Sequence, residues 1–581
     1  MPDNAIKDLI DVATGRRLAD LVLKNAHVLN VVSNEIHDGD IAIFAERIAG
    51  IGNYQAHETL DLKGQYVCPG FIDAHVHIES SLLSVPEFAR VVVARGTTAV
   101  IADPHEFANV MGTEGISFVL RAAKYAPIDV YMMLSSCIPA SPLETAGTEL
   151  NAEDLQPFLG NPWVLGLAEM MNFPGVIAAD EDALHKIAMS EDRIVDGHAP
   201  GLTGRDLSAY AAAGIMSDHE CITAEEAADK LRHGLHIMIR EGSQARNLKA
   251  LLPLVTPATA GRFMFCTDDK KVQQLLEEGQ IDFMVRTAIA EGIDPILAVR
   301  LASFNAARYF GLHRTGAVLP GYRADLTVLE DLEECRVTQV FRRGELVAED
   351  GRCVMPKHAG EARSSLRSSI DTHWIEPDDF LIPLPDECSQ VAPPKIHVIR
   401  VLEDRIDTER SIETAAVRDG CFVADPAQDL AKILVIERHR ASGEIGRGFV
   451  KGFQLKAGAI ASSVAHDAHN LIVVGVDDDD MRAAVIRLIK LHGGFVVVRG
   501  GEVLADVPLP IAGLVSGDPA ERVNAQLQKI NTAAREIGCH LDHPFMALSF
   551  LSLSVIGKLK LTNQGLIDVE AFRAIPLVVD E

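Results

Sequence analysis

The chain contains a series of short apolar runs, and side chains that commonly bind metal ions stand at the ends of several of them. The first run leads into a histidine–any–histidine pair, His75 and His77. Because side chains alternate along a β-strand, both imidazoles point to one face and can reach the same ion. Later runs end at residues of the same chemical kind, which are Glu169, His198, His219 and Asp268. This ordered set constrains the fold more than any single motif does.

The apolar runs alternate with helix-like stretches, which is typical of a parallel sheet covered on both faces. Including the run before His75 there are eight, and the others cover residues 98–102, 130–134, 164–168, 194–195, 215–217, 237–239 and 263–266. Eight such units predict a (β/α)8 TIM-like barrel, in which catalytic residues lie at the C-terminal ends of the strands. Every candidate ligand occupies such an end.

The ligand types predict a centre of two metal ions. A carbamylated lysine could bridge two ions from the fourth strand, but that strand ends Gly166-Leu-Ala-Glu-Met170 and has no lysine. A carboxylate can span two ions unaided, so Glu169 is the expected bridge. His198 and His219 would ligate the second ion, and Asp268 could ligate the first and take a proton from bound water. The alternative is that these residues are hydrogen-bonded histidines and turn caps.

Shifts in composition predict the domain boundaries. Short alternating strands on both sides of the barrel could pair into one small β-sandwich, and a connector containing Ser and Pro precedes a further α+β region. In that region residues 471–476 are expected as a strand and Asp477 as the cap of a helix, followed by a hairpin over 496–507. The predicted units are residues 1–66 with 315–356 (sandwich), 67–314 (catalytic barrel), 357–396 (linker) and 397–581 (C-terminal α+β domain).

Composition and charge exclude several classes of protein. The 581 residues are 48% hydrophobic, enough for more than one domain, and the nine scattered cysteines suggest neither a disulfide framework nor a zinc ribbon. No apolar signal core or membrane span is evident, so we expect a cytoplasmic protein. The net charge of −28 disfavours nucleic acid as a partner, because phosphate binding needs basic surface.

Long segments of the chain resemble the bacterial adenine deaminases of the amidohydrolase superfamily. Asp103-Pro-His-Glu106, Glu169-Met-Met-Asn-Phe-Pro-Gly175 and Ser217-Asp-His-Glu-Cys221 are the most specific of them. Further matching segments cover residues 69–81, 97–102, 196–201, 237–243, 265–269, 316–325, 463–470 and 509–514. The likeness therefore extends over nearly the whole chain. It departs after Asp269, where the chain continues Lys270-Lys-Val-Gln-Gln274 in place of a His-Pro-like turn, and this bears on substrate preference.

The resemblance implies hydrolysis of adenine to hypoxanthine and ammonia by a metal-bound hydroxide, with two divalent ions, manganese or iron. It implies that His75, His77, Glu169, His198, His219 and Asp268 form the metal shell. It also implies that Glu106 is the acid/base group that protonates the ring nitrogen and then the leaving amine. A purine is thus the expected small-molecule partner, and we expect a homo-oligomer, a dimer.

Other polar residues near these motifs have less defined roles. His105, Glu220, Glu241 and Asp269 are candidates for substrate binding, although His105 and Glu220 could instead orient ligands and Glu241 could pair with Arg240 or another base. In the C-terminal region, His466, Asp467 and His469 could form another metal site, but the pattern favours capping roles.

Two functions from other classes compete with deamination of adenine or of another purine. One is hydrolysis of a cyclic amide, as by a hydantoinase or dihydropyrimidinase, although those enzymes generally depend on the carbamylated lysine that is missing here. The other is a non-catalytic scaffold that kept the barrel. An intact set of costly polar groups argues against the scaffold.

Overall fold

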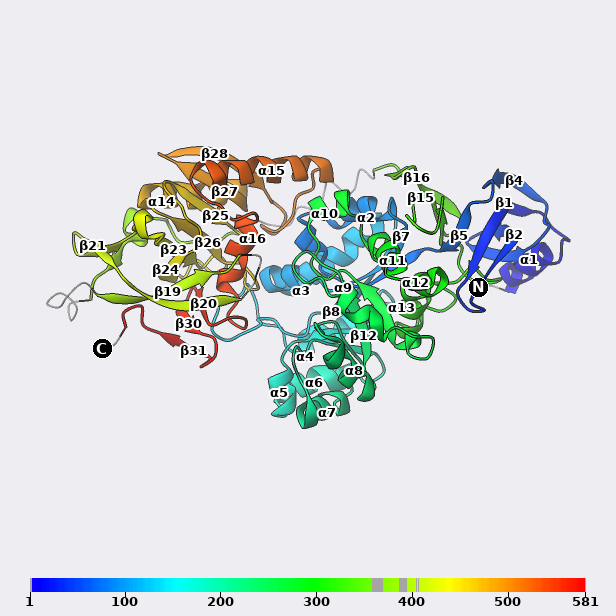
Figure 1. The fold of residues 1–581 in the computed structure, drawn as a ribbon, viewed down its shortest axis with the longest axis horizontal. Helices are drawn as coiled ribbons and strands as arrows, with labels where there is room; N and C mark the ends of the chain where they lie inside the picture. Colours follow the sequence, from blue (N-terminus) through cyan, green and yellow to red (C-terminus); the bar gives the residue numbers. More distant parts are fainter. Residues whose placement is uncertain (1–2, 358–368, 386–393, 404, 406, 580–581) are drawn as a thin grey trace.

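The structure, a computed structural model, describes residues 3–357, 369–385, 394–403, 405 and 407–579. Three regions follow one another along its longest axis (Figure 1). The N-terminal strands lie at the right of the view, the barrel in the centre and the C-terminal domain at the left. In the described ranges, no helix combines the length and the apolar character needed to cross a bilayer.

The predicted barrel is confirmed in the described part of the chain. Its parallel strands form two hydrogen-bonded runs, β10-β9-β8-β7-β6 and β11-β12-β13. The strands are β6 (Phe71–Val76), β7 (Thr97–Ala102), β8 (Asp129–Leu134), β9 (Val164–Met170), β10 (Ile194–Gly197), β11 (Ser217–Asp218), β12 (His236–Arg240) and β13 (Phe263–Cys266). A parallel bridge between Val76 and Asp268 joins the first strand to the end of the last. On the other side the backbone N–H of Met216 donates to the oxygen of Val195 at 2.9 Å, between β10 and β11, and the circle is closed.

Helices cover the outside of the barrel. They are α2 (Val85–Val93), α3 (His105–Ala122), α6 (Glu181–Met189), α7 (Gly204–Ala212), α8 (Ala224–Arg232), α11 (Ile281–Ala290), α12 (Pro295–Leu301) and α13 (Phe304–Tyr309). Buried residues of neighbouring strands, among them Ile72, Ile101, Met133 and Met264, pack into one cluster with α13. The barrel is therefore a filled core, and its polar groups gather at the strand ends.

The strand segments that flank the barrel pair with each other. They form one nine-stranded sheet in which β14 (Leu326–Leu329) runs antiparallel to β5 (Tyr66–Pro69). The other strands are β1 (Ala19–Asn30), β2 (Glu35–Phe44), β3 (Arg47–Ile51), β4 (Ala56–Asp61), β15 (Val337–Arg342), β16 (Glu345–Glu349) and β17 (Arg352–Cys353). The chain thus leaves this sheet through β5, enters the barrel at β6, and returns through β14.

The C-terminal domain is built on an eight-stranded sheet of order β20-β19-β24-β23-β26-β25-β27-β28. Its strands are β19 (Lys395–Val401), β20 (Thr408–Thr414), β23 (Ala431–Ile436), β24 (Ile445–Lys451), β25 (Ala459–Ser462), β26 (Leu471–Gly475), β27 (Gly494–Arg499) and β28 (Glu502–Pro508). Helix α14 (Asp478–Leu491) packs in one apolar cluster with this sheet, and α15 (Ala520–Glu536) and α16 (Pro544–Ser549) pack in another. The predicted strand, capped helix and hairpin all occur here.

The predicted linker falls partly outside the described residues, since 358–368 and 386–393 are not described. Within its described part, Phe380 is fully buried against the cluster of α14, and Ile382 pairs with Phe422. This part of the connector therefore packs as structure of the C-terminal domain.

Candidate active site

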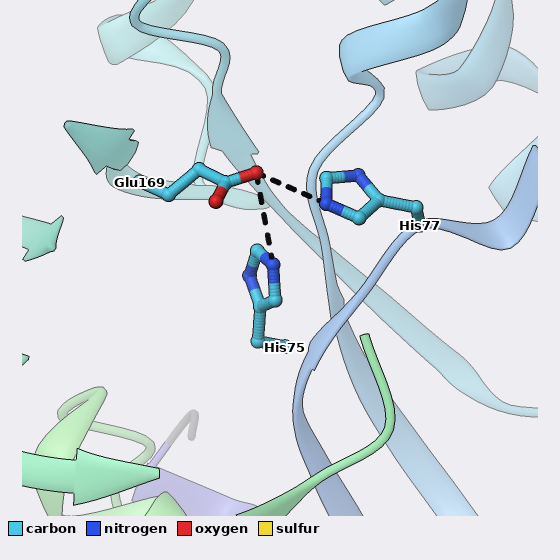
Figure 2. A group of neighbouring side chains, drawn as sticks. All are labelled: His75, His77 and Glu169. Atoms are coloured by element: carbon cyan, nitrogen blue, oxygen red, sulfur yellow. Dashed lines mark ion pairs between the residues drawn. The ribbon is translucent and has the colours of Figure 1, made fainter. Parts of the chain in front are cut away.

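The strand ends bring together all six side chains that the sequence proposed as metal ligands. His75 and His77 come from the end of β6, and Glu169 lies in β9 facing both (Figure 2). Oε1 of Glu169 is 3.0 Å from Nε2 of His77 and 4.0 Å from Nε2 of His75. Asp268, which follows β13, places Oδ1 3.3 Å from Nε2 of each of these histidines.

The other oxygen of Glu169 faces the second pair of histidines. Oε2 lies 2.7 Å from Nδ1 of His198 and 3.2 Å from Nε2 of His219. One carboxylate therefore contacts both histidine pairs through different oxygens. Combinations of these ligand atoms lie within 4.8 Å of one another, close enough to hold a metal ion.

The donor set fits divalent cations. Nε2 of His75 and Nε2 of His219 are buried and make no hydrogen bond, although each lies near a carboxylate. Ligand atoms about 2.1 Å from a shared ion would be about 3.0–3.4 Å apart. The separations of 3.0–3.3 Å from Nε2 of His77 and His219 to Glu169, and from Nε2 of His75 and His77 to Asp268, fall in this range. Histidine nitrogens with bridging carboxylates are also the donors that such ions prefer. The structure thus contains groups suited to a divalent metal centre.

Neighbouring polar groups orient the ligands. Nδ1 of His77 lies 3.2 Å from the backbone oxygen of Asp103, which leaves Nε2 free to face the centre. Nη1 of Arg240 donates to Oδ2 of Asp268 at 2.9 Å, and Nη2 donates to Glu220 at 3.0 Å. Asp268 itself has a φ of 56°, a left-handed conformation that costs energy for a non-glycine residue and persists only when its surroundings fix it.

Glu106 lies at the start of α3 and contacts the C-terminal domain. It is buried, with Oε1 2.9 Å from Nδ1 of His466 and Oε2 hydrogen-bonded to Nε2 of His469. Burial opposes charge on this carboxyl, but the two histidines hold its pKa well below the usual range. Burial likewise opposes charge on His466, yet the Glu106 carboxylate raises the pKa of His466 to about 9.

The four candidates for substrate binding occupy different places. Glu220 has Oε1 3.4 Å from Nε2 of His219 and pairs with Arg240, so it borders the ligand set. Nε2 of His105 lies 3.4 Å from Oδ2 of Asp467, and Asp269 accepts a hydrogen bond from the hydroxyl of Ser80. Glu241 accepts the backbone N–H of Leu248 at 3.1 Å, and Arg240 instead pairs with Glu220 and Asp268.

The sequence did not assign His466, Asp467 or His469 to the active site. Their pattern favours capping roles, and His469 does accept the backbone N–H of Ala465 at Nδ1, at 3.1 Å. Its other nitrogen, however, reaches Glu106 across the domain boundary. The available signal was the dense group of titratable residues in 463–470, directly after β25, inside a segment that carries the family resemblance.

A cavity that opens to solvent lies between the barrel and the C-terminal domain, and it encloses about 920 Å³ when the solvent space at its mouth is included. The barrel side contributes Glu79, Ser80, Glu106 and Asp269. The C-terminal side contributes His466, His469 and His543 and the rings of Phe495, Phe545 and Phe550. Lys271, Val272 and Gln273 also line it, so the segment that departs from the family pattern borders this cavity.

The barrel and its ligand set define a class of protein, the amidohydrolases. Residues 66–347 match the amidohydrolase family, and residues 405–573 match the adenine deaminase C-terminal domain. A protein of Desulfatibacillum aliphaticivorans named adenine deaminase is 48% identical over 571 residues, covering 98% of this chain and 99% of that protein. An adenine deaminase of Dehalococcoides mccartyi (strain ATCC BAA-2266 / KCTC 15142 / 195) is 48% identical over 572 residues, with the same coverage.

A third relative, adenine deaminase 2 of Carboxydothermus hydrogenoformans, is 46% identical over 573 residues, covering 98% of this chain and 99% of its own length. Identity of this extent over both domains shows the family. The chain belongs to the adenine deaminase family. This finding favours a deaminase over a cyclic amide hydrolase or a scaffold without activity.

Proposed function

We propose that the strand-end centre and Glu106 together hydrolyse adenine to hypoxanthine and ammonia, the reaction of the family. The observation that carries the proposal is that the Glu169 carboxylate contacts both histidine pairs through its two oxygens. We assign His75, His77 and Asp268 to one divalent ion, His198 and His219 to a second, and Glu169 to both. Such a pair of ions would supply a hydroxide nucleophile at neutral pH.

Deamination requires two proton transfers to the purine. Addition of hydroxide at the carbon that bears the amine places negative charge on the ring, and a proton on the neighbouring nitrogen neutralises it. The amine must then be protonated, because an amide anion is a very poor leaving group. Both protons originate from the attacking water, so the site needs a group that receives protons and groups that deliver them.

The positions of Asp268 and Glu106 suit these tasks. Asp268 lies among the histidines of the centre and is placed to receive a proton from the water. Glu106 lines the cavity, and we assign to it the delivery of protons to the ring nitrogen and then to the amine. Its low pKa means that it starts as a carboxylate and takes up each proton before passing it on.

The experiment that tests this assignment is Glu106→Gln. The variant should bind two metal ions and purine normally but lose turnover by roughly 10²- to 10⁴-fold, because the amide cannot cycle a proton. Glu114→Gln on an exposed turn of the same helix is the matched control and should keep normal turnover. If Glu106 were only a structural residue at the start of the helix, its variant would be less stable but retain nearly normal turnover.

Four further properties of the enzyme concern its metal ions, its oligomeric state, its location in the cell and its preferred purine. We propose that the ions are manganese or iron, that the protein is a dimer, and that it works in the cytoplasm. Metal analysis beside a panel of purines assayed for ammonia release would identify the ion and the best substrate together. Loading by manganese or ferrous iron with adenine as the preferred purine is the expected result, and preference for another purine would overturn the substrate assignment.

A further inference from the structure

The loop 463–470 of the C-terminal domain meets the first turn of α3 in the barrel. His105 and Glu106 are the first residues of this helix, and both contact the loop. Nε2 of His105 lies 3.4 Å from Oδ2 of Asp467. The carboxylate of Glu106 contacts His466 and His469. A second set of hydrogen bonds holds the loop nearby, with Asn470 donating to the backbone oxygen of Thr145 at 2.9 Å. The loop is therefore docked on the barrel through its polar side chains.

We propose that His466 and His469 are positioning residues that hold the Glu106 carboxylate, so that the C-terminal domain completes the proton-transfer site of the barrel. This inference rests on the proposed role of Glu106 in catalysis. The two oxygens of the carboxylate are divided between the two imidazoles, Oε1 to His466 and Oε2 to His469. Because each oxygen has its own imidazole partner, both the position and the orientation of the carboxylate are restricted.

Contacts of His469 fix its tautomer. The backbone N–H of Ala465 donates to Nδ1, so this nitrogen carries no proton and Nε2–H must be the donor to Glu106. The side chain is fully buried, and burial lowers the pKa of this histidine. His469 is therefore a fixed neutral donor to the carboxylate.

His466 is held by the C-terminal domain on its other sides. Its ring stacks on Phe550, with centroids 4.7 Å apart and planes at 14°. Its backbone N–H donates to the oxygen of Ser549 at 2.9 Å, and its backbone oxygen accepts from Ser552 at 3.1 Å. The ring that contacts Glu106 thus has a position set by α16 and the residues after it.

A buried carboxylate needs such donors. Glu106 is 5% exposed, and an unpaired charged carboxyl in that environment would be strongly destabilised. Without the imidazoles the carboxyl would take up a proton or turn toward the open cavity. The first change would alter the protonation state of the proton-transfer group and the second its position, and a misplacement of about 1 Å can reduce the rate by about a hundredfold.

The test compares alanine variants, which remove each imidazole donor to Glu106, with amide variants, which put a side-chain amide donor in its place. His469→Ala and His466→Ala should each lower kcat by roughly ten- to a hundredfold, with KM and metal content little changed. His469→Gln keeps an amide donor near the position of Nε2, and His466→Asn keeps one near Nδ1, so these variants should recover part of the lost kcat. His540→Asn, on an exposed residue of the same domain, is the control and should behave as the unchanged protein.

The outcomes separate this inference from the assignment of Glu106. Full turnover in both alanine variants, alongside an inactive Glu106→Gln, would refute the positioning role and leave the proposed function intact. Full turnover in Glu106→Gln would instead remove the assignment on which the inference rests. Glu106, His466 and His469 also have ligand atoms within 4.8 Å of one another. Three metal ions per chain that fall to two in the histidine variants would show a metal site here and overturn the positioning role.

Discussion

The barrel and the C-terminal domain bring side chains to the site in two different ways. In the barrel each ligand lies at the end of a strand or just after it, and the parallel strands end at one face, so the circle alone brings His75, Glu169 and Asp268 together. In the C-terminal domain His466 and His469 lie in a loop after β25 and reach the site only because this domain docks on α3. The ligands of the barrel are brought together within a single domain, whereas the two histidines reach the site only through the contact between two domains.

Because of this difference, substitutions in the two domains should have different effects on metal content and turnover. Loss of a strand-end ligand removes a metal donor and should abolish chemistry directly. Loss of a docked histidine leaves the ions in place and disturbs only the group that it holds. We therefore expect substitutions in the barrel to change metal content and substitutions in the loop 463–470 to change turnover at constant metal content.

Glu169→Gln should have the largest effect. The variant keeps the shape of the side chain but loses the charge that both ions share, so it should retain about one ion and lose turnover by about 10³-fold or more. Activity of the unchanged protein should be independent of added bicarbonate, because no carbamylated lysine is needed. Metal analysis with turnover measurements tests both statements, and a variant that still binds two ions would remove Glu169 from the centre.

Arg240→Met should have an intermediate effect. It removes the donor to Asp268 and the partner of Glu220, so Asp268 is less well oriented and metal affinity or turnover should fall by roughly 10- to 100-fold. Arg232→Met, on an exposed residue of α8, is the control and should leave both properties unchanged. Unaltered metal affinity and turnover in Arg240→Met would show that Asp268 is oriented by the backbone alone.

Asp477→Ala should have the smallest effect and should leave catalysis unchanged. The Asp477 side chain accepts the N–H of Asp480 at 3.0 Å and caps α14, so its loss should cost about 1 kcal/mol of stability. Thermal unfolding measures this loss, and Asp479→Ala, which keeps the cap, should cost less. A large drop in turnover would mean that the packing of α14 is coupled to the active site.

Much of the barrel could be predicted from the sequence, because the signals are local. Apolar runs predict the strands, for instance 263–266 for β13, and the polar residues that follow the runs predict the face on which ligands meet. The helix cap at Asp477 was equally local. Similar alternating strands on both sides of the barrel predicted that the two flanking segments could pair, but not that β5 and β14 would be the strands that join them.

The remaining features depend on contacts that local patterns do not encode. No spacing in the sequence relates Glu106 to His469, because 363 residues separate them and their contact forms only when two domains pack. The partner of Glu241 is equally undetermined by local patterns, since its carboxylate accepts the backbone N–H of Leu248, the first residue of the short helix α9 (Leu248–Leu251). The pairing of Arg240 with Glu220 and Asp268 likewise joins the ends of separate strands.

The most direct test of the central claim is a metal titration of the chelated, inactive protein. The contacts of Glu169 with both histidine pairs predict that two divalent ions bind per chain. Activity should return with manganese or ferrous iron and reach its full value only at the second equivalent. Full activity at one equivalent, with no further binding, would contradict the account.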